Sequence, residues 1–203
     1  MYSAFEQLES EKKSHIINAA LKEFAKNGYE KASTNNIVKE ARISKGSLYN
    51  YFGTKKGLYL YLVEVSTEII EQVYALIDPK ESDIFLKIEK IGFGKIEIQQ
   101  RYPQVFDFLF SMTQDQSADI TALNKDNINK IYSEGLQKMY ENIDYYLFKD
   151  EVDSEKAIDI LNWTILGYGN QAIETKSSTA ELKEEYLKDW ESYSKILRHA
   201  FYK

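Results

Sequence analysis

The segment from Ser44 to Leu58, SKGSLYNYFGTKKGL, carries hydroxyl, amide, phenol and amine side chains close to three glycines. Hydroxyl and amine groups beside glycine are used in hydrolase loops and in loops that bind phosphate. The same groups on one face of a helix can contact the bases and phosphates of DNA. The choice between these uses depends on the elements on either side of the segment.

The flanking sequence predicts helices. Apolar residues at helical spacing indicate a first helix that ends at Asn27-Gly28, because glycine readily adopts the left-handed conformation that terminates helices. A helix over residues 45–52 is expected to end at Gly53, and a longer one continues to about Ile77. Three hydroxyl residues are placed to cap helices that begin after them: Ser33, Ser44 and Thr54.

The rest of the chain has the same helical character. Only two prolines occur among 203 residues, and no segment alternates convincingly like a strand. The remaining candidate helices cover roughly 82–101, 103–113, 119–148, 153–175 and 179–202. The sequence therefore predicts an all-α protein. No apolar run approaches the ~18 residues of a membrane span, and no cysteine is present, so we expect a cytoplasmic protein without a membrane partner.

The helix at 45–52 has two different faces. Leu48 and Phe52 fall together at spacing i, i+4 and can pack on the preceding helices, whereas Asn50 points almost opposite to them. Gly46 and Ser47 lie beside Asn50, and the tyrosines at 49 and 51 flank this polar face. A helix with a small polar N-terminal end suits the DNA major groove, where Ser47 and Asn50 could bond base edges. Two helices joined by a three-residue turn in this way form a helix-turn-helix.

Charge is distributed unevenly along the chain. Residues 1–60 contain 10 Lys and Arg against 6 Asp and Glu, whereas residues 61–203 contain 16 against 26. A basic N-terminal part on an acidic body is typical of a DNA-binding module joined to a larger domain with another role. The alternative is chance clustering of solvated lysines, and Lys55 and Lys56 alone could equally mark a solvated helix end.

Residues 16–58 resemble the N-terminal DNA-binding domain of the TetR family of bacterial transcriptional regulators. The similarity rests on ordered positions along this segment: Phe24, Gly28, Tyr29, Ser33, Ile37, Ala41, Ser44, Lys45, Gly46, Ser47, Leu48, Tyr49, Tyr51, Phe52, Lys55 and Leu58. The resemblance implies a homodimer that binds a DNA operator, usually as a repressor, and releases it when a small molecule enters the C-terminal domain.

The resemblance also implies a domain plan. A three-helix DNA-binding domain, residues 1–54, is joined through a long helix to a helical ligand-binding and dimerisation domain, residues 55–203. By position, Ser33, Thr34 and Lys55 match frequent phosphate contacts of the family. Residues and resemblance together give eleven predicted DNA contacts: Ser33, Thr34, Arg42, Lys45, Gly46, Ser47, Tyr49, Asn50, Tyr51, Lys55 and Lys56.

Two positions depart from the family pattern. Arg42 replaces the glycine commonly found in the turn, and Gly57 stands where an acidic residue is usual. Arginine in a left-handed conformation would cost about 1 kcal/mol. Either the turn is right-handed here, or Arg42 has a phosphate of its own to contact.

The acidic body is rich in aromatic residues, which suits both core packing and an apolar cavity with hydroxyl groups. Inward spacing on the middle helices selects seven candidates for lining an effector site: Phe85, Phe93, Phe106, Phe110, Met139, Trp163 and Tyr168. Acidic residues such as Asp115 could contact a cationic ligand there, or could simply be solvated.

The last two helices are predicted to form the dimer face by four-helix packing. Eight residues are predicted to contribute to this face: Ile158, Leu161, Ile165, Gly167, Tyr186, Trp190, Tyr193 and Leu197.

Catalysis has little support in the sequence. His15 and His199 lie at opposite ends of the chain and belong to no triad-like or metal-spaced set. We therefore expect no enzyme activity, no metal and no cofactor. One competing hypothesis keeps DNA binding but makes the protein an activator or a nucleoid-type binder. The others are a non-catalytic helical protein that binds small molecules without operator specificity, and a helical enzyme or carrier whose basic N-terminal part is incidental.

Overall fold

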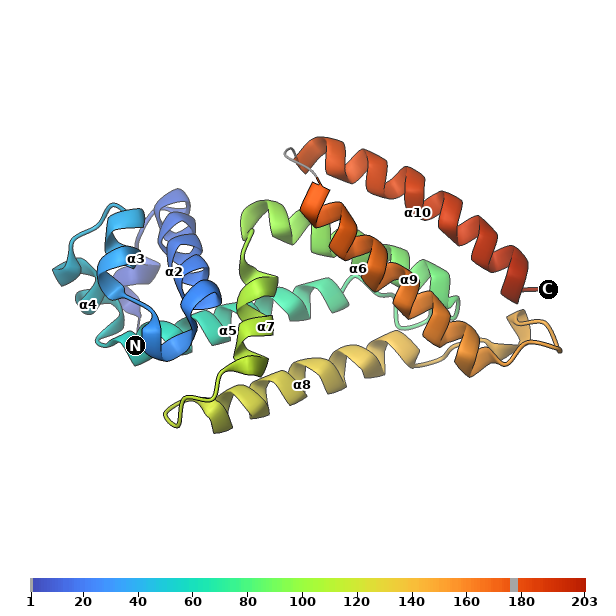
Figure 1. Cartoon of the computed structure of the whole chain (residues 1–203), viewed down its shortest axis with the longest axis horizontal. Helices are drawn as coiled ribbons and strands as arrows, with labels where there is room; N and C mark the ends of the chain where they lie inside the picture. Colours follow the sequence, from blue (N-terminus) through green and yellow to red (C-terminus); the bar gives the residue numbers. More distant parts are fainter. Residues whose placement is uncertain (1, 176–178) are drawn as a thin grey trace. The chain divides into compact units, whose positions relative to one another are not determined.

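The computed structural model describes the backbone of residues 2–175 and 179–203, and the side chains of these residues except 166 and 169–187. Its elements follow one another as α-helices with one short 3-10 helix (Figure 1). They are α1 (Ser3–Glu6), α2 (Ser10–Lys31), α3 (Thr34–Glu40), α4 (Lys45–Phe52), α5 (Lys55–Tyr74), α6 (Ile84–Arg101), α7 (Val105–Gln114), α8 (Thr121–Tyr140), η1 (Tyr145–Leu147), α9 (Ser154–Thr175) and α10 (Thr179–Phe201). The all-α prediction is confirmed. None of the helices in the described ranges is long and apolar enough to cross a membrane.

The chain forms two compact units. The first consists of residues 1–75 and 97–136, and the second of residues 76–96 and 137–203, so that α6 and α8 each contribute to both. The domain plan predicted from the sequence, with DNA binding in residues 1–54 and effector binding and dimerisation in residues 55–203, describes functions and not these compact units. It stays a prediction.

Local signals in the N-terminal part are confirmed. The hydroxyls of Ser33, Ser44 and Thr54 each accept a backbone hydrogen bond from the third residue after them, at 3.4, 2.9 and 2.9 Å. Each bond satisfies one of the amide groups left unpaired at a helix start, which typically stabilises a helix by about 1 kcal/mol. Gly28 interrupts α2 with a φ of 66°, as expected, and one further turn continues to Lys31.

Two expectations were incomplete or wrong. The four-residue helix α1 was not predicted at all. The helix expected over 119–148 ends at Tyr140, because the chain turns at Asn142, whose φ is 58°. The bend leads into η1, where Asp144 accepts a hydrogen bond from the backbone of Tyr146 at 3.0 Å.

The core of the first unit joins helices that are far apart in the sequence. Phe24 of α2, Tyr59 of α5 and Phe108 of α7 are almost completely buried. The ring of Tyr59 lies 5.1 Å from that of Phe24 and 5.4 Å from that of Phe108, both edge-on. Burial of each such ring is worth about 1.5–3 kcal/mol, so α7 is an integral part of the unit that contains α2 to α4.

The second unit has its own core, formed by residues of α6, α9 and α10 together with Ile143 and Phe148. Asp83 lies before α6 and pairs with Arg198 of α10 at 2.6 Å, while the Arg198 guanidinium lies 4.7 Å from the ring of Phe85. The buried amine of Lys87 donates to the carbonyl of Glu141 at the end of α8. A cation at this position offsets the negative end of the helix dipole.

Candidate nucleic-acid interface

Helix α4 is held by two buried side chains. Leu48 and Phe52 are only 2% and 5% exposed. The Phe52 ring lies 4.8 Å from that of Phe5 and 5.3 Å from that of Tyr61. The predicted division of this helix into an apolar inner face and a polar outer face is therefore confirmed.

The outer face presents groups that can contact DNA. Lys45, Gly46, Tyr49 and Asn50 are exposed, whereas Ser47 is half-buried. The Ser47 hydroxyl lies 2.9 Å from that of Ser44, so in the free protein it shares a hydrogen bond with the cap. A hydroxyl on the first turn of α4 and an exposed amide on the next turn are side chains that can bond base edges.

Tyr51 is tied to the interior more closely than Tyr49. Its ring packs edge-on to Phe5 at a centroid distance of 5.8 Å, and it is half-buried. Tyr49 is 39% exposed. The Tyr51 ring is thus held in place by Phe5, whereas the more exposed Tyr49 side chain has more freedom to change its rotamer.

The turn before α4 is left-handed at Arg42, with a φ of 52°. The backbone amide of Ile43 then donates to the carbonyl of Val38 at 3.1 Å and closes the end of α3. Arg42 is exposed and retains the strain that glycine would avoid. The right-handed alternative considered from the sequence is therefore wrong, and a phosphate contact by Arg42 remains as the hypothesis.

The end of α3 is fastened to α2 by charge. Lys22 pairs with Glu40 at 2.9 Å, and the ring of His15 lies 3.0 Å from the Glu40 carbonyl oxygen. The hydrogen bond from Lys22, followed by the charge of its amine, lowers the pKa of the Glu40 carboxyl. The pair is solvent-exposed, so its contribution to stability is modest.

The start of α3 is held by Glu23 of α2. Its carboxylate accepts from the backbone amide of Ser33 at 2.8 Å and from the side-chain amide of Asn36 at 3.3 Å. Ser33 and Thr34 are half-buried at this point. Glu23 was not predicted, because its position about one turn before the break at Gly28 does not show which backbone amide it meets.

The two lysines at the start of α5 are not equivalent. The Lys55 amine donates to the Glu30 carbonyl at 2.9 Å and lies 5.1 Å above the ring of Tyr29, so its charge is engaged within the protein. Lys56 is exposed. Both stay predicted DNA contacts, and Lys56 has the freer amine for a phosphate.

Two glycines shape the connection from α4 to α5. Gly53 has φ 74° and ψ −54°, and the Thr54 amide donates to the Phe52 carbonyl at 2.8 Å, which together form a γ-turn. This tight turn places the Phe52 carbonyl oxygen where a Cβ of residue 57 would lie. The unusual glycine at 57 is therefore explained by the geometry of the turn.

Residues 16–62 match the profile of a known family, described as bacterial regulatory proteins of the tetR family. The match covers α3, the left-handed turn, α4 and the start of α5, the same elements that build the exposed polar face. The chain belongs to the TetR family.

Relatives of known name agree with this assignment. The chain is 24% identical over 175 residues to the biofilm operon icaADBC HTH-type negative transcriptional regulator IcaR of Staphylococcus aureus, covering 85% of this chain and 94% of that protein. It is 47% identical over 53 residues to the transcriptional regulator YuxN of Bacillus subtilis, covering 26% of this chain and 18% of YuxN.

Solved structures share the fold. A TetR family regulator from Chloroflexus aurantiacus superimposes with a TM-score of 0.60 at 24% identity, over 99% of this chain and 98% of the other. The ketosteroid regulator KstR2 of Mycobacterium tuberculosis has the same TM-score at 16% identity, over 97% of each chain. Together with the family match over residues 16–62 and the similarity to IcaR, this fold identifies a TetR-type DNA-binding transcriptional regulator.

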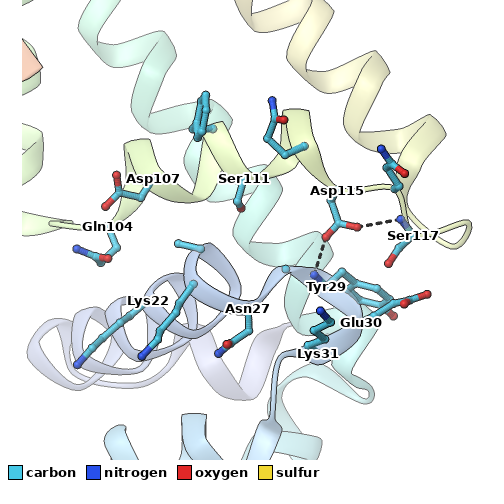
Figure 2. Close-up of a pocket in the computed structure, with 16 residues that line it drawn as sticks. Lys22, Asn27, Tyr29, Glu30, Lys31, Gln104, Asp107, Ser111, Asp115 and Ser117 are labelled. Atoms are coloured by element: carbon cyan, nitrogen blue, oxygen red, sulfur yellow. Dashed lines mark hydrogen bonds between the residues drawn. The ribbon is translucent and has the colours of Figure 1, made fainter.

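In this TetR-family chain a groove of about 920 Å³ runs between α2 and α7 (Figure 2). Its α2 side includes Lys22 and Tyr29, and its α7 side includes Phe110 and Ser111. The groove lies entirely within the first unit. Its size falls within the range of small-molecule sites.

Asp115 closes one end of this groove. Figure 2 shows its carboxylate directed from the end of α7 to α2, where it accepts the backbone amide of Tyr29 at 2.6 Å and that of Ser117 at 2.9 Å. The first bond falls directly after the break at Gly28. Asp115 was considered as a ligand carboxylate or a solvated residue. In the structure it connects the end of α7 to the last turn of α2, and it also lines the groove.

A second hydrogen bond joins α2 to the last residue of α6, at the connection to α7. The side-chain amide of Asn18 on α2 donates to the carbonyl of Arg101 at 2.9 Å, just before α7 begins. Between the two bonds, Val105, Phe108 and Met112 are buried in the shared core. Pairs so distant in sequence leave no local signal, and sequence reasoning missed both.

The seven predicted effector residues are divided between the units. Phe106 and Phe110 belong to the first and the other five to the second. Phe110 is 67% exposed and lines the groove, whereas Phe85 is 1% exposed and packs in the second core. Trp163 is 67% exposed. The remaining four are half-buried: Phe93, Phe106, Met139 and Tyr168.

The predicted dimer residues also differ in exposure. Three of them are buried within this chain: Ile158, Leu161 and Trp190. Ile165 and Leu197 are partly buried against the same core, whereas Gly167 is exposed and Tyr193 is 40% exposed. The side chain of Tyr186 lies outside the described residues. The prediction of a dimer face on α9 and α10 remains untested by these positions.

Proposed function

We propose that this regulator is a repressor that binds a palindromic operator as a dimer and is released by a small molecule with an apolar or aromatic part. The observation that carries the DNA-reading role is the two-faced α4, with Leu48 and Phe52 buried and Tyr49 and Asn50 exposed. Repression is supported by the extended similarity to IcaR, a negative regulator. We place its activity in the cytoplasm, where its operator would be.

In this proposal residues 1–54 bind DNA, and residues 55–203 bind the effector and form the dimer. Asn50 and Ser47 read base edges, and Tyr49 contacts a phosphate or a thymine methyl group. The amines of Lys45 and Lys56 contact phosphates, as does the guanidinium of Arg42.

DNA binding is tested by fluorescence anisotropy with a palindrome from the DNA upstream of the protein's own gene, against a scrambled duplex of equal length. A specific regulator should bind the palindrome at about 10⁻⁸ M or tighter and lose affinity steeply with salt. Tyr49→Ala and Asn50→Ala should each weaken this binding by about 1–3 kcal/mol. Asn50→Ala should leave the scrambled duplex unaffected, because the Asn50 amide is proposed to read base edges. Unchanged binding in both variants would contradict the assignment of α4.

Footprinting and reporter expression then distinguish repression from its alternatives. A repressor protects a discrete site that overlaps a promoter and lowers expression from it. Protection upstream of the promoter with raised expression would instead support an activator. Uniform protection would support a DNA-binding protein without operator specificity.

For the dimer we propose the exposed stripes of α9 and α10, two helices that pack side by side (Figure 1). Ile160 and Trp163 are 40% and 67% exposed on α9, and Tyr193 and Ile196 are 40% and 66% exposed on α10. Apolar groups of this size, gathered on neighbouring helices, are typical of a surface that a partner covers.

The dimer proposal is tested by analytical ultracentrifugation. Trp163→Glu should shift the protein from dimer to monomer, because the new carboxylate would be buried at the contact. Tyr146→Glu is the matched control, since Tyr146 is 87% exposed but lies on η1. Dimers of undiminished stability in the Trp163 variant would contradict the proposed face.

The effector part of the proposal is supported by the size of the α2–α7 groove and by the exposed Phe110 in it. Only the α7 side of this groove belongs to residues 55–203, and its α2 side belongs to residues 1–54, so an effector there would contact both parts. Native mass spectrometry of protein purified from its host, followed by an electron-density map, would identify a retained molecule and its position. That molecule should release the labelled operator. A molecule that strengthens operator binding would instead make it a corepressor.

A further inference from the structure

Residues 2–8 precede the segment that matches the family profile, yet they fold onto it. Helix α1 has only four residues, and isolated helices of this length are not stable in water. Its single buried residue, Phe5, is nevertheless 0% exposed. Tertiary contacts must therefore hold this segment in place.

The contacts are aromatic and are directed at α4. The Phe5 ring lies 5.8 Å from Tyr51 and 4.8 Å from Phe52 on α4, and 5.2 Å from Tyr61 on α5. Tyr2 adds a second layer, with its ring 6.0 Å from Phe52 and 4.7 Å from Tyr61. All five pairs are tilted or edge-on, the arrangements that favour attraction between rings.

Polar groups fasten the same segment to α5 and α2. The Tyr61 hydroxyl donates to the Glu6 carboxylate at 2.9 Å, and the Lys13 amine pairs with Glu6 at 3.2 Å. The Tyr2 hydroxyl lies 3.4 Å from the Gly57 carbonyl. Phe5 is thus held against both α4 and α5.

Helix α4 needs such support. It spans eight residues and buries only Leu48 and Phe52, so two side chains alone anchor it. Phe5 contacts one of these anchors and also Tyr51, the residue beside it on the edge of the outer face. Removal of the Phe5 ring would leave space for the C-terminal end of α4 to tilt.

We propose that residues 2–8 buttress the DNA-reading helix and that Phe5 is a positioning residue for operator recognition. The inference rests on the proposed reading role of α4. Phe5 is buried and does not itself contact DNA. Its effect is exerted through Tyr51 and Phe52, and through them on the outer face of α4.

The test compares three substitutions in the full-length chain at a temperature where circular dichroism shows each to be folded. Phe5→Ala should weaken operator binding about tenfold, equivalent to one lost base contact, with little effect on a scrambled duplex. Phe5→Leu should restore most of the affinity because it refills much of the space. Ile69→Ala is the matched control, since Ile69 is a 6% exposed residue of the same core on α5.

Hydrogen exchange supplies the second measurement. Amides of residues 48–52 should exchange faster in Phe5→Ala than in Ile69→Ala, whereas amides of α7 should not differ between the two. The inference would be overturned if folded Phe5→Ala bound the operator as tightly as the wild type. It would also be overturned if Ile69→Ala lost as much operator affinity as Phe5→Ala. If Phe5→Ala is unfolded at all temperatures, Phe5→Val takes its place and is compared with Phe5→Leu. The ratio of affinity for the operator to affinity for the scrambled duplex should then be lower in Phe5→Val, which fills less of the space. Absence of specific binding by the wild type would refute the proposed function itself.

Discussion

Arg42 allows stability and DNA binding to be separated in one residue. Its φ of 52° lies in the left-handed region, where a non-glycine residue costs roughly 1–2 kcal/mol. Glycine would remove this strain, but its greater freedom in the unfolded chain offsets roughly 0.5–1 kcal/mol. Arg42→Gly should therefore raise the free energy of unfolding by up to about 1.5 kcal/mol. For a chain of this size the melting temperature then rises by up to roughly 6 °C.

The same substitution should impair DNA binding if Arg42 contacts a phosphate. Each phosphate neutralised by the protein contributes about 0.9 to the slope of log affinity against log salt concentration. Arg42→Gly should lower the magnitude of this slope by about one per protomer and weaken the operator and a scrambled duplex alike. The measurements are a thermal melt by circular dichroism and a salt series by fluorescence anisotropy.

Two further variants separate charge from strain. Arg42→Ala removes the charge but keeps the left-handed strain, so it should lose DNA affinity without any gain in melting temperature. Arg42→Lys keeps the charge and should retain most of the salt slope. A lower melting temperature for Arg42→Gly would refute the strain argument. An unchanged salt slope in both the Gly and Ala variants would refute the phosphate contact.

Three other substitutions test the remaining contacts. Lys56→Ala should lower the dependence of DNA affinity on salt without altering the melting temperature. Lys55→Ala should lower both, because the Lys55 amine contacts the Glu30 carbonyl and the Tyr29 ring within the protein. Equal melting temperatures of the two variants would contradict this distinction. Phe52→Ala should reduce the free energy of unfolding by about 3–5 kcal/mol in urea titrations, and an unaltered midpoint would show that the burial of α4 is misassigned. Asp115→Ala leaves the Tyr29 amide without its acceptor, so the free energy of unfolding should fall by about 1–3 kcal/mol and the hydrogen of that amide should exchange faster. Asp115→Asn keeps an acceptor oxygen and should retain part of this hydrogen bond. Slow exchange in the Ala variant would argue against this connection.

The features that were predicted correctly depend on residues close together in the sequence. The buried pair Leu48 and Phe52 follows from i, i+4 spacing, and the capping roles of Ser33, Ser44 and Thr54 follow from their position before short helical segments. In each case one turn of helix contains all the partners. Local physical rules are sufficient for such features.

The features that were missed depend on partners that the sequence does not bring together. Asp115 and Tyr29 are 86 positions apart, and nothing near Asp115 indicates that its carboxylate accepts a backbone amide of α2. Phe5 was missed because a four-residue helix shows too little periodicity to be recognised. The glycine at 57 could be noticed as unusual, but its partner, the nearby carbonyl of Phe52, is placed there by a tight turn at Gly53 that the sequence does not reveal.

The exposure of the C-terminal aromatics was also beyond reach from sequence. Spacing assigned Phe85 and Phe110 to the same inward set, yet they are 1% and 67% exposed and belong to different units. An apolar residue at helical spacing identifies a face of its helix. It does not specify whether another helix, a ligand or a second chain covers that face.

The connection between α7 and α2 restricts how a proposed effector can act on DNA binding. To separate the two helices would expose the ring of Phe108, at about 1.5–3 kcal/mol, and leave the Tyr29 amide unpaired, at about 1–3 kcal/mol. Further cost would come from Met112 and from the Asn18 hydrogen bond. Coupling energies between sites are typically about 1–3 kcal/mol, less than this sum. An effector should therefore move α7 together with α2 and reorient the DNA-binding helices as a body, because it has too little differential binding energy to pull them apart.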